Sequence, residues 1–170
     1  ALRQAVAAHV AAAGHAVHDI GPLTPESTDY PARGEAAARK VAAGEADLGI
    51  VLCGTGQGIM MAANKVRGIR CGVCSDTFSA AMIRAHNDAN MLALGARVVG
   101  EGLALEIVDA FLSTPFERGR HALRVDMIKA QEDKAEDLAS CATLIQQSAR
   151  NKPRSGAGPA PDRPRGLARW

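Results

Sequence analysis

The residues with the clearest capacity for chemistry lie at positions 53–58, where the sequence reads CGTGQG. The preceding run, Leu48–Leu52, is aliphatic without alternation, which is typical of a parallel strand buried on both faces. Cys53 would therefore stand at the carboxyl end of a strand, where open α/β sheets bind their ligands. Three alternate glycines allow the backbone to turn its N–H groups inward, and a helix expected over Ile59–Lys65 begins behind them.

Two interpretations of this turn stay open on the residue pattern alone. Converging N–H groups and a helix N-terminus favour an anion, and they favour a thiolate because they lower a cysteine pKa from about 8.5. Cys53 would then be a reactive group, with Thr55 beside it. The alternative is that Cys53 is a small core residue and that the glycines only permit a tight turn.

Two further clusters carry side chains that could bind a polar or anionic ligand. His86 and Asn87 end an expected helix, where they could hydrogen-bond a sugar hydroxyl or ring oxygen, although a histidine there also interacts with the helix dipole. Arg120 and Arg124 lie four residues apart at the start of another helix, so the two guanidinium groups share one face. Paired guanidinium groups fit a phosphate, and the alternative is a solvated basic surface.

Other motifs point to weaker alternatives. Cys71 and Cys74 form a CxxC pattern, but residues three apart in a strand face opposite sides, which argues against a zinc or redox pair. The GTGQGI run departs from the dinucleotide fingerprint because Ile59 stands where the third glycine belongs. Asp76 nevertheless lies at a suitable distance for a ribose, so a nucleotide-binding module is the second hypothesis.

The elements that must position these residues alternate between helix and strand. Helices are expected over Ala1–Ala13, Ala32–Ala43, Ile59–Lys65, Thr77–His86, Glu101–Leu112 and from Arg120 to about Gln147, the last frayed or broken near Asp133; strands are expected over Ala16–Ile20, Leu48–Leu52, Ile69–Cys74 and Met91–Leu94. This order predicts a Rossmann-like, three-layer α/β/α domain with a mostly parallel sheet.

Composition sets the outer limits. The chain has 170 residues, of which 47% are hydrophobic and 22% charged, which fits one globular domain. We expect this domain to cover residues 1–149 and the Pro-, Gly- and Arg-rich residues 150–170 to be a disordered basic tail. The body is mildly acidic, and no apolar run approaches the length of a membrane span, so we expect a cytoplasmic protein with reduced cysteines that binds neither nucleic acid nor membrane.

Five motifs in order resemble the type B ribose-5-phosphate isomerases, in the family shared with the galactose-6-phosphate isomerase subunits. They are STDYP (27–31), CGTGQGIMMAANKVRGIR (53–70), HNDAN (86–90), LGARVVG (94–100) and GRHALRV (119–125), and the resemblance runs from Ala1 to about Glu132. It implies a homodimer or homotetramer that interconverts ribose 5-phosphate and ribulose 5-phosphate through an enediolate, in the pentose phosphate pathway. It also implies that neither metal nor cofactor is needed.

The resemblance also implies roles for individual residues. Cys53 would be the base, Thr55 would help to hold the oxyanion, and His86 would assist ring opening, reaching the site from the neighbouring subunit. Substrate binding would fall to Tyr30, Gly54, Gly56, Gly58, Asn87, Arg97, Arg120 and Arg124. Among these, the three arginines would bind phosphate, and the tyrosine would line the sugar pocket. Some members carry a glutamate just after the glycine loop, where this chain has Ile59, so it resembles the cysteine type.

The chain departs from the family pattern at its start. The family begins with a strand that carries an Asp-His pair, whereas this chain begins one element later, at a helix. The resemblance therefore implies that two site residues are missing here and that the flanks of neighbouring strands are exposed. A hexose-6-phosphate isomerase, a nucleotide-binding module and an inactive family member that only dimerises are the alternatives to an active pentose-phosphate isomerase.

Overall fold

The computed structural model describes residues 1–22 and 29–134, and residues 1–132 form one compact unit. The helices are α1 (Leu2–Ala12), α2 (Tyr30–Ala42), α3 (Gln57–Ala63), α4 (Thr77–Asn87) and α5 (Glu101–Ser113), followed by a helix over 120–134; the strands are β1 (Gly49–Cys53), β2 (Cys71–Val73) and β3 (Met91–Gly95). None of the helices in these ranges combines the length and apolar character that crossing a membrane requires.

The three strands form a parallel sheet in the order β1-β3-β2. In the β1–β3 ladder, Gly49 pairs with Met91 and Cys53 with Gly95, so both strands end at the same edge. The central strand reads MLALG and is buried at every position, as expected for a run without polar alternation. The prediction of a parallel α/β sheet is confirmed.

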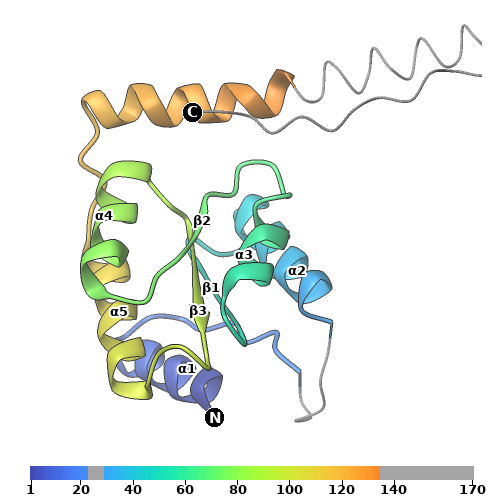
Figure 1. Cartoon of the computed structure of the whole chain (residues 1–170), viewed down its shortest axis with the longest axis vertical. Helices are drawn as coiled ribbons and strands as arrows, with labels where there is room; N and C mark the ends of the chain where they lie inside the picture. The colour runs from blue at the N-terminus through green and yellow to red at the C-terminus, as the bar shows by residue number, and fades with distance from the viewer. Residues whose placement is uncertain (23–28, 135–170) are drawn as a thin grey trace, which may run out of the picture. The chain divides into compact units, whose positions relative to one another are not determined.

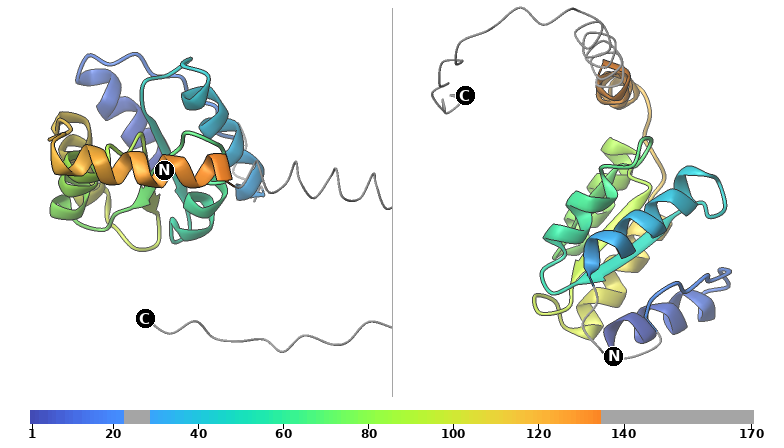
Figure 2. Two further views of the ribbon diagram at one scale, coloured as in Figure 1. Left: turned by 90° about the horizontal axis from the view of Figure 1, so that it is seen from above. Right: turned by 90° about the vertical axis from the view of Figure 1, so that its right-hand side faces the viewer.

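Helices cover both faces of this sheet, which gives three layers (Figures 1 and 2). Leu92 and Leu94 of β3 belong to the core cluster that includes residues of α1, α4 and α5. Met91 and Ala93, on the other face, pack in a second cluster with residues of α2 and α3. Because successive side chains of a strand point to opposite faces, one five-residue strand contributes to both cores.

The predicted strand over Ala16–Ile20 is wrong, because these residues follow α1 without joining the sheet. Asp19 is held instead by an ion pair with Arg3 and by the Gly21 N–H, which donates to Asp19 Oδ1 over 2.9 Å. Those local contacts fix the segment without a backbone ladder, and within the described residues β1 pairs with β3 alone.

The last helix runs through Asp133 to Lys134, where the described residues end, so the break or fraying expected near Asp133 stays a prediction. The remainder of that helix, Cys141 and the basic tail over 150–170 lie outside the described residues.

Candidate active site

Cys53 ends β1 and turns its partly exposed side chain toward the glycine turn. The Gly56 N–H donates to Cys53 Sγ over 3.2 Å, so one main-chain donor already faces the sulfur. Gly56 adopts φ +79°, and a Cβ placed on it would lie 2.7 Å from Val73 Cγ2. A side chain at this position would therefore be both strained and crowded, which explains why glycine occupies it.

Two other predicted residues flank the same turn. A Cβ on Gly58 would lie 2.5 Å from the ring of Tyr30, so the absence of a side chain lets the tyrosine lie against the start of α3. Arg97 follows β3, and its main-chain N–H donates to Gly54 O over 2.9 Å. A Cβ on Gly54 would lie 3.5 Å from Arg97 Nε, which places this guanidinium beside the turn.

This first group of residues forms part of the lining of a cavity of about 1100 Å³, most of which is lined by α1, the segment 15–22, α2 and β1. Its lining includes Tyr30, Cys53, Gly54, Thr55, Gly58 and Arg97. Arg33 and His18 also line the cavity, and sequence reasoning missed both. For Arg33 a signal was available, because it lies three residues after Tyr30 on one helix and therefore shares its face.

His86 and Asn87 lie at the other end of the molecule's central strand, where α4 ends just before β3. Arg70 holds this segment: its Nε donates to Asn87 O over 3.1 Å, and its Nη2 donates to Asp88 O over 2.6 Å. Asp88 ends the helix in the left-handed conformation, with φ 47°, and its carboxylate forms an ion pair with Arg70 at 3.0 Å. The sequence offered no pattern that linked Arg70 to this segment.

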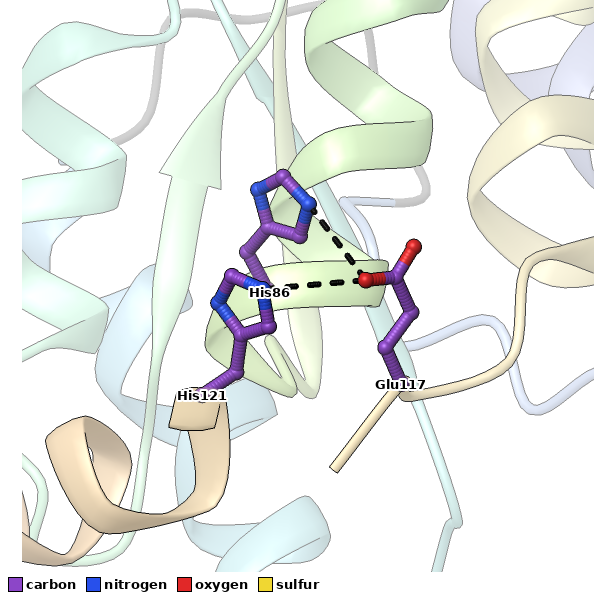
Figure 3. Close-up of side chains that lie close together, drawn as sticks. All are labelled: His86, Glu117 and His121. Carbon is purple, nitrogen blue, oxygen red and sulfur yellow. Dashed lines mark ion pairs between the residues drawn. The ribbon is translucent and has the colours of Figure 1, made fainter. Parts of the chain in front are cut away.

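His86 stacks on His121, with ring centroids 4.1 Å apart and planes 1° from parallel (Figure 3). Glu117 Oε2 lies 3.7 Å from His86 Nε2 and 3.6 Å from His121 Nε2. Burial lowers the pKa of the His121 imidazole below its usual value, and the nearby His86, Arg120 and Arg124 lower it further because they repel a second positive charge, although Glu117 acts in the opposite sense.

Arg120 and Arg124 are exposed on the helix over 120–134, beside His121. The Arg120 Nε donates to His121 Nε2 over 3.4 Å. The two arginines thus lie with His86 and not with Arg97, so the three arginines predicted to share a phosphate do not come together in one chain.

The candidate residues therefore form two groups, one at the carboxyl ends of the strands and one at their amino ends. The first group surrounds Cys53 at the carboxyl ends of the strands, since Cys53 pairs with Gly95. The second group lies at the amino ends, because α4 runs back past the sheet and the Gly49 N–H donates to Asn90 O over 2.9 Å at the start of β1. Figure 1 shows the end of α4 and the start of the last helix at the top of the view, with the strands pointing downward.

A family model described as Ribose/Galactose Isomerase matches residues 1–128 of the chain. The chain belongs to this family. It is 50% identical over 133 residues to ribose-5-phosphate isomerase B of Escherichia coli (strain K12), covering 78% of this chain and 89% of that protein. It is 42% identical over 116 residues to galactose-6-phosphate isomerase subunit LacB of Clostridium acetobutylicum, covering 68% of this chain and 67% of that protein.

Solved structures of the family agree with this assignment. Ribose-5-phosphate isomerase B of Clostridium thermocellum superposes with a TM-score of 0.78 at 51% identity, covering 79% of this chain and 90% of that chain. The Mycoplasma genitalium enzyme, whose structure holds bound ribulose-5-phosphate, superposes with a TM-score of 0.75 at 39% identity, covering 78% of this chain and 88% of that chain.

In this member of the ribose/galactose isomerase family, Asp76 is a helix cap. Its Oδ1 accepts a hydrogen bond from the Ser79 N–H over 2.7 Å at the start of α4. The same backbone donor lowers the pKa of the Asp76 carboxyl. The capping interaction accounts for this aspartate, so it gives no support to the nucleotide-binding alternative.

The two cysteines of the CxxC pattern lie on opposite faces of the sheet. Cys71 belongs to the core cluster on the α2–α3 face of the sheet, and Cys74 to the cluster on the opposite face. Burial raises the pKa of the Cys71 thiol to about 12 and that of the Cys74 thiol to about 11. Both are free cysteines, and the prediction that they do not form a redox or zinc pair agrees with their placement.

Proposed function

We propose that the chain is a sugar-phosphate isomerase that interconverts ribose 5-phosphate and ribulose 5-phosphate, with Cys53 as the base. One observation carries this proposal: the Cys53 sulfur accepts a main-chain hydrogen bond at 3.2 Å and lines a cavity of about 1100 Å³ together with Tyr30 and Arg97. The identity to ribose-5-phosphate isomerase B supports the choice of a pentose phosphate.

The proposed chemistry uses one base and fixed donors. The Cys53 thiolate removes the proton from C2 of the open-chain aldose, and the electron pair moves to form the enediolate, with negative charge on the O1 oxygen. Main-chain N–H groups of the glycine turn stabilise that oxygen. A second proton passes from the O2 hydroxyl to O1, and the sulfur returns the first proton to C1, which leaves the ketone carbonyl at C2. Because protons and electrons only move within the substrate and the base, the reaction consumes no cofactor. A reactive thiolate of this kind suits a reducing compartment such as the cytoplasm.

We further propose that two copies of the chain share each active site. His86 and Asn87 would reach the Cys53 cavity of a second subunit, together with the phosphate-binding Arg120 and Arg124. The arrangement of the two groups at opposite edges of one sheet supports this, because a single chain keeps them apart. The helix that carries Arg124 also exposes an apolar surface, formed by Leu123 (66% exposed), Met127 (61%) and Ile128 (43%). An exposed apolar patch of this kind suits a dimer interface.

The experiment that tests the reaction is turnover of ribose 5-phosphate by the full chain, in the presence of EDTA. Cys53→Ala should lose a factor of about 10²–10⁴ in kcat, the usual contribution of a general base. Cys74→Ala is the matched control, because Cys74 is buried in the core and away from the cavity lining. Equal loss in both variants, with both folded, would contradict the role of Cys53.

The same assay separates the alternatives. Faster turnover of galactose 6-phosphate than of ribose 5-phosphate would favour a hexose-phosphate isomerase. Tight binding of NAD or ATP without turnover would favour a nucleotide-binding module. A folded dimer that does neither would be an inactive family member.

A mixing experiment tests the shared site. Cys53→Ala and His86→Asn should each be inactive alone, because each lacks one half of every site. In a dimer with two shared sites, random exchange of subunits gives one intact site in half of the dimers, so the mixture should regain about a quarter of the wild-type rate. No recovery after demonstrated subunit exchange would refute sharing.

A further inference from the structure

Three side chains with metal-ligating atoms converge outside the cavity of Cys53. They are His86 at the end of α4, Glu117 in the segment before the last helix and His121 in its first turn (Figure 3). Glu117 Oε2 lies 3.7 Å from His86 Nε2 and 3.6 Å from His121 Nε2. Taking one ligand atom from each residue, all three lie within 4.8 Å of one another, and no other such cluster occurs among the residues that the structure describes.

The two separations that involve Glu117 are close to those of a tetrahedral zinc site, whereas the two imidazole nitrogens lie only within 4.8 Å of each other. With metal–ligand bonds of about 2.0–2.2 Å, ligand atoms at tetrahedral angles lie about 3.4 Å apart. The observed 3.6 and 3.7 Å exceed that value by a few tenths of an ångström. The stacked rings are parallel, so one ring must tilt for both lone pairs to reach a common ion. The His86 side chain is 37% exposed and can turn, whereas the His121 side chain, at 10%, is held by packing.

We propose that His86, Glu117 and His121 form a binding site for Zn²⁺ or a similar borderline-soft divalent transition metal. Two imidazoles and one carboxylate are a donor set that zinc uses in proteins, and three protein ligands leave a fourth position for water. Mg²⁺ and Ca²⁺ prefer oxygen ligands, so this site discriminates against them.

Some neighbouring groups favour metal binding at this site, and others oppose it. Burial lowers the pKa of His121, which favours the neutral ring that a metal ligand must have. Glu117 supplies a negative charge, but Arg120 Nε lies 3.4 Å from His121 Nε2 and competes for the same lone pair. The cations Arg120 and Arg124 also repel a divalent ion. We therefore expect weaker binding than at a structural zinc site with four protein ligands.

Occupation of the site would have a consequence for catalysis, and this consequence alone rests on the proposed function. A metal bound to His86 Nε2 removes the lone pair with which that imidazole would act on the sugar. Zn²⁺ would then be a reversible inhibitor of the isomerase rather than a cofactor. Binding of the ion itself does not depend on turnover.

The test is a titration of the full chain with Co²⁺, followed by its visible absorption, and displacement by Zn²⁺. Wild type should show saturable binding of one ion per chain, and Glu117→Gln should weaken it about tenfold or more, since even residues that only support a ligand contribute 10- to 100-fold. Asp109→Asn is the matched control. Asp109 Oδ1 pairs with His9 Nε2 at 2.6 Å, but this histidine–carboxylate pair has no third metal-ligating group beside it among the described residues. This control should bind as wild type does.

Several outcomes would overturn the metal site. They are an absence of saturable Co²⁺ absorption, equal weakening in Glu117→Gln and Asp109→Asn, or unchanged binding in a folded His121→Asn variant. Zn²⁺ inhibition is measured separately with ribose 5-phosphate and should be relieved by EDTA and weaker in Glu117→Gln. If Co²⁺ binds at the site but wild type shows no turnover, the metal site stands and the proposed function fails.

Discussion

Replacing Gly56 with alanine perturbs the turn behind Cys53 in a way that the structure makes quantitative. Gly56 has φ +79°, and a Cβ there would lie 2.7 Å from Val73 Cγ2 and 3.0 Å from the Leu94 carbonyl carbon. Leu94 belongs to the fully buried central strand, so its backbone has little room to move. The variant must therefore carry both a backbone penalty and a packing penalty.

The two penalties can be separated with a matched glycine. A non-glycine residue in the left-handed region costs about 1–2 kcal/mol, and an extra carbon forced into a packed core costs about 1–3 kcal/mol. Gly56→Ala should therefore lower the free energy of unfolding by about 2–5 kcal/mol. Gly44 has φ +74°, but a Cβ there would meet nothing within 4 Å, so Gly44→Ala should show only the first penalty.

The assay is urea unfolding of both variants, combined with turnover by the folded protein. Because the Gly56 N–H donates to Cys53 Sγ, displacing the turn should also reduce kcat in Gly56→Ala, and Gly44→Ala should keep it. Equal losses of stability in the two variants would refute the packing argument. Normal kcat in a folded Gly56→Ala protein would show that the turn does not need its observed geometry for catalysis.

Three other predictions each depend on the surroundings of particular side chains. Iodoacetamide should label Cys53 in the native protein but spare Cys71 and Cys74, whose pKa values are raised to about 12 and about 11 by burial, and peptide mass spectrometry would detect any exception. Asn64→Ala should cost about 1–3 kcal/mol in urea unfolding, because Asn64 exchanges two hydrogen bonds of 2.8 Å with the backbone of Cys71; no loss would mean that water replaces them. The lowered pKa of His121 means that the unfolded chain binds a proton more readily, so stability should fall as pH drops through about 6.5, and His121→Gln should flatten that part of the unfolding profile.

Sequence patterns were sufficient to predict elements such as a strand that is buried on both faces. The run Met91–Leu94 has no polar alternation, and β3 is indeed buried on both faces. The helix expected over Thr77–His86 forms as α4, and the Asp76 carboxylate at its start accepts the Ser79 N–H. In these places the chain's local preference and its tertiary surroundings favour the same conformation, so the local pattern was enough.

Long-range contacts were beyond the reach of such patterns. Ala16–Ile20 has residues that favour a strand. A strand forms, however, only where its backbone can pair with that of a neighbouring strand. Here the Arg3–Asp19 ion pair holds the segment instead. Arg70 supports Asn87 and Asp88 across 17 and 18 positions of sequence, through hydrogen bonds to backbone oxygens that any residue types could supply. Periodicity carries no information about a contact of that kind.

The separation of the candidate residues into two groups follows from the topology itself. In a parallel sheet every strand ends at one edge, so residues that follow strands, such as Cys53 and Arg97, gather there. Each connecting helix must return to the opposite edge, so residues at a helix end, such as His86, are carried away from them. Five motifs in family order therefore do not specify one cleft in one chain. If His86 and Cys53 act on the same sugar, the second edge has to come from another copy of the chain.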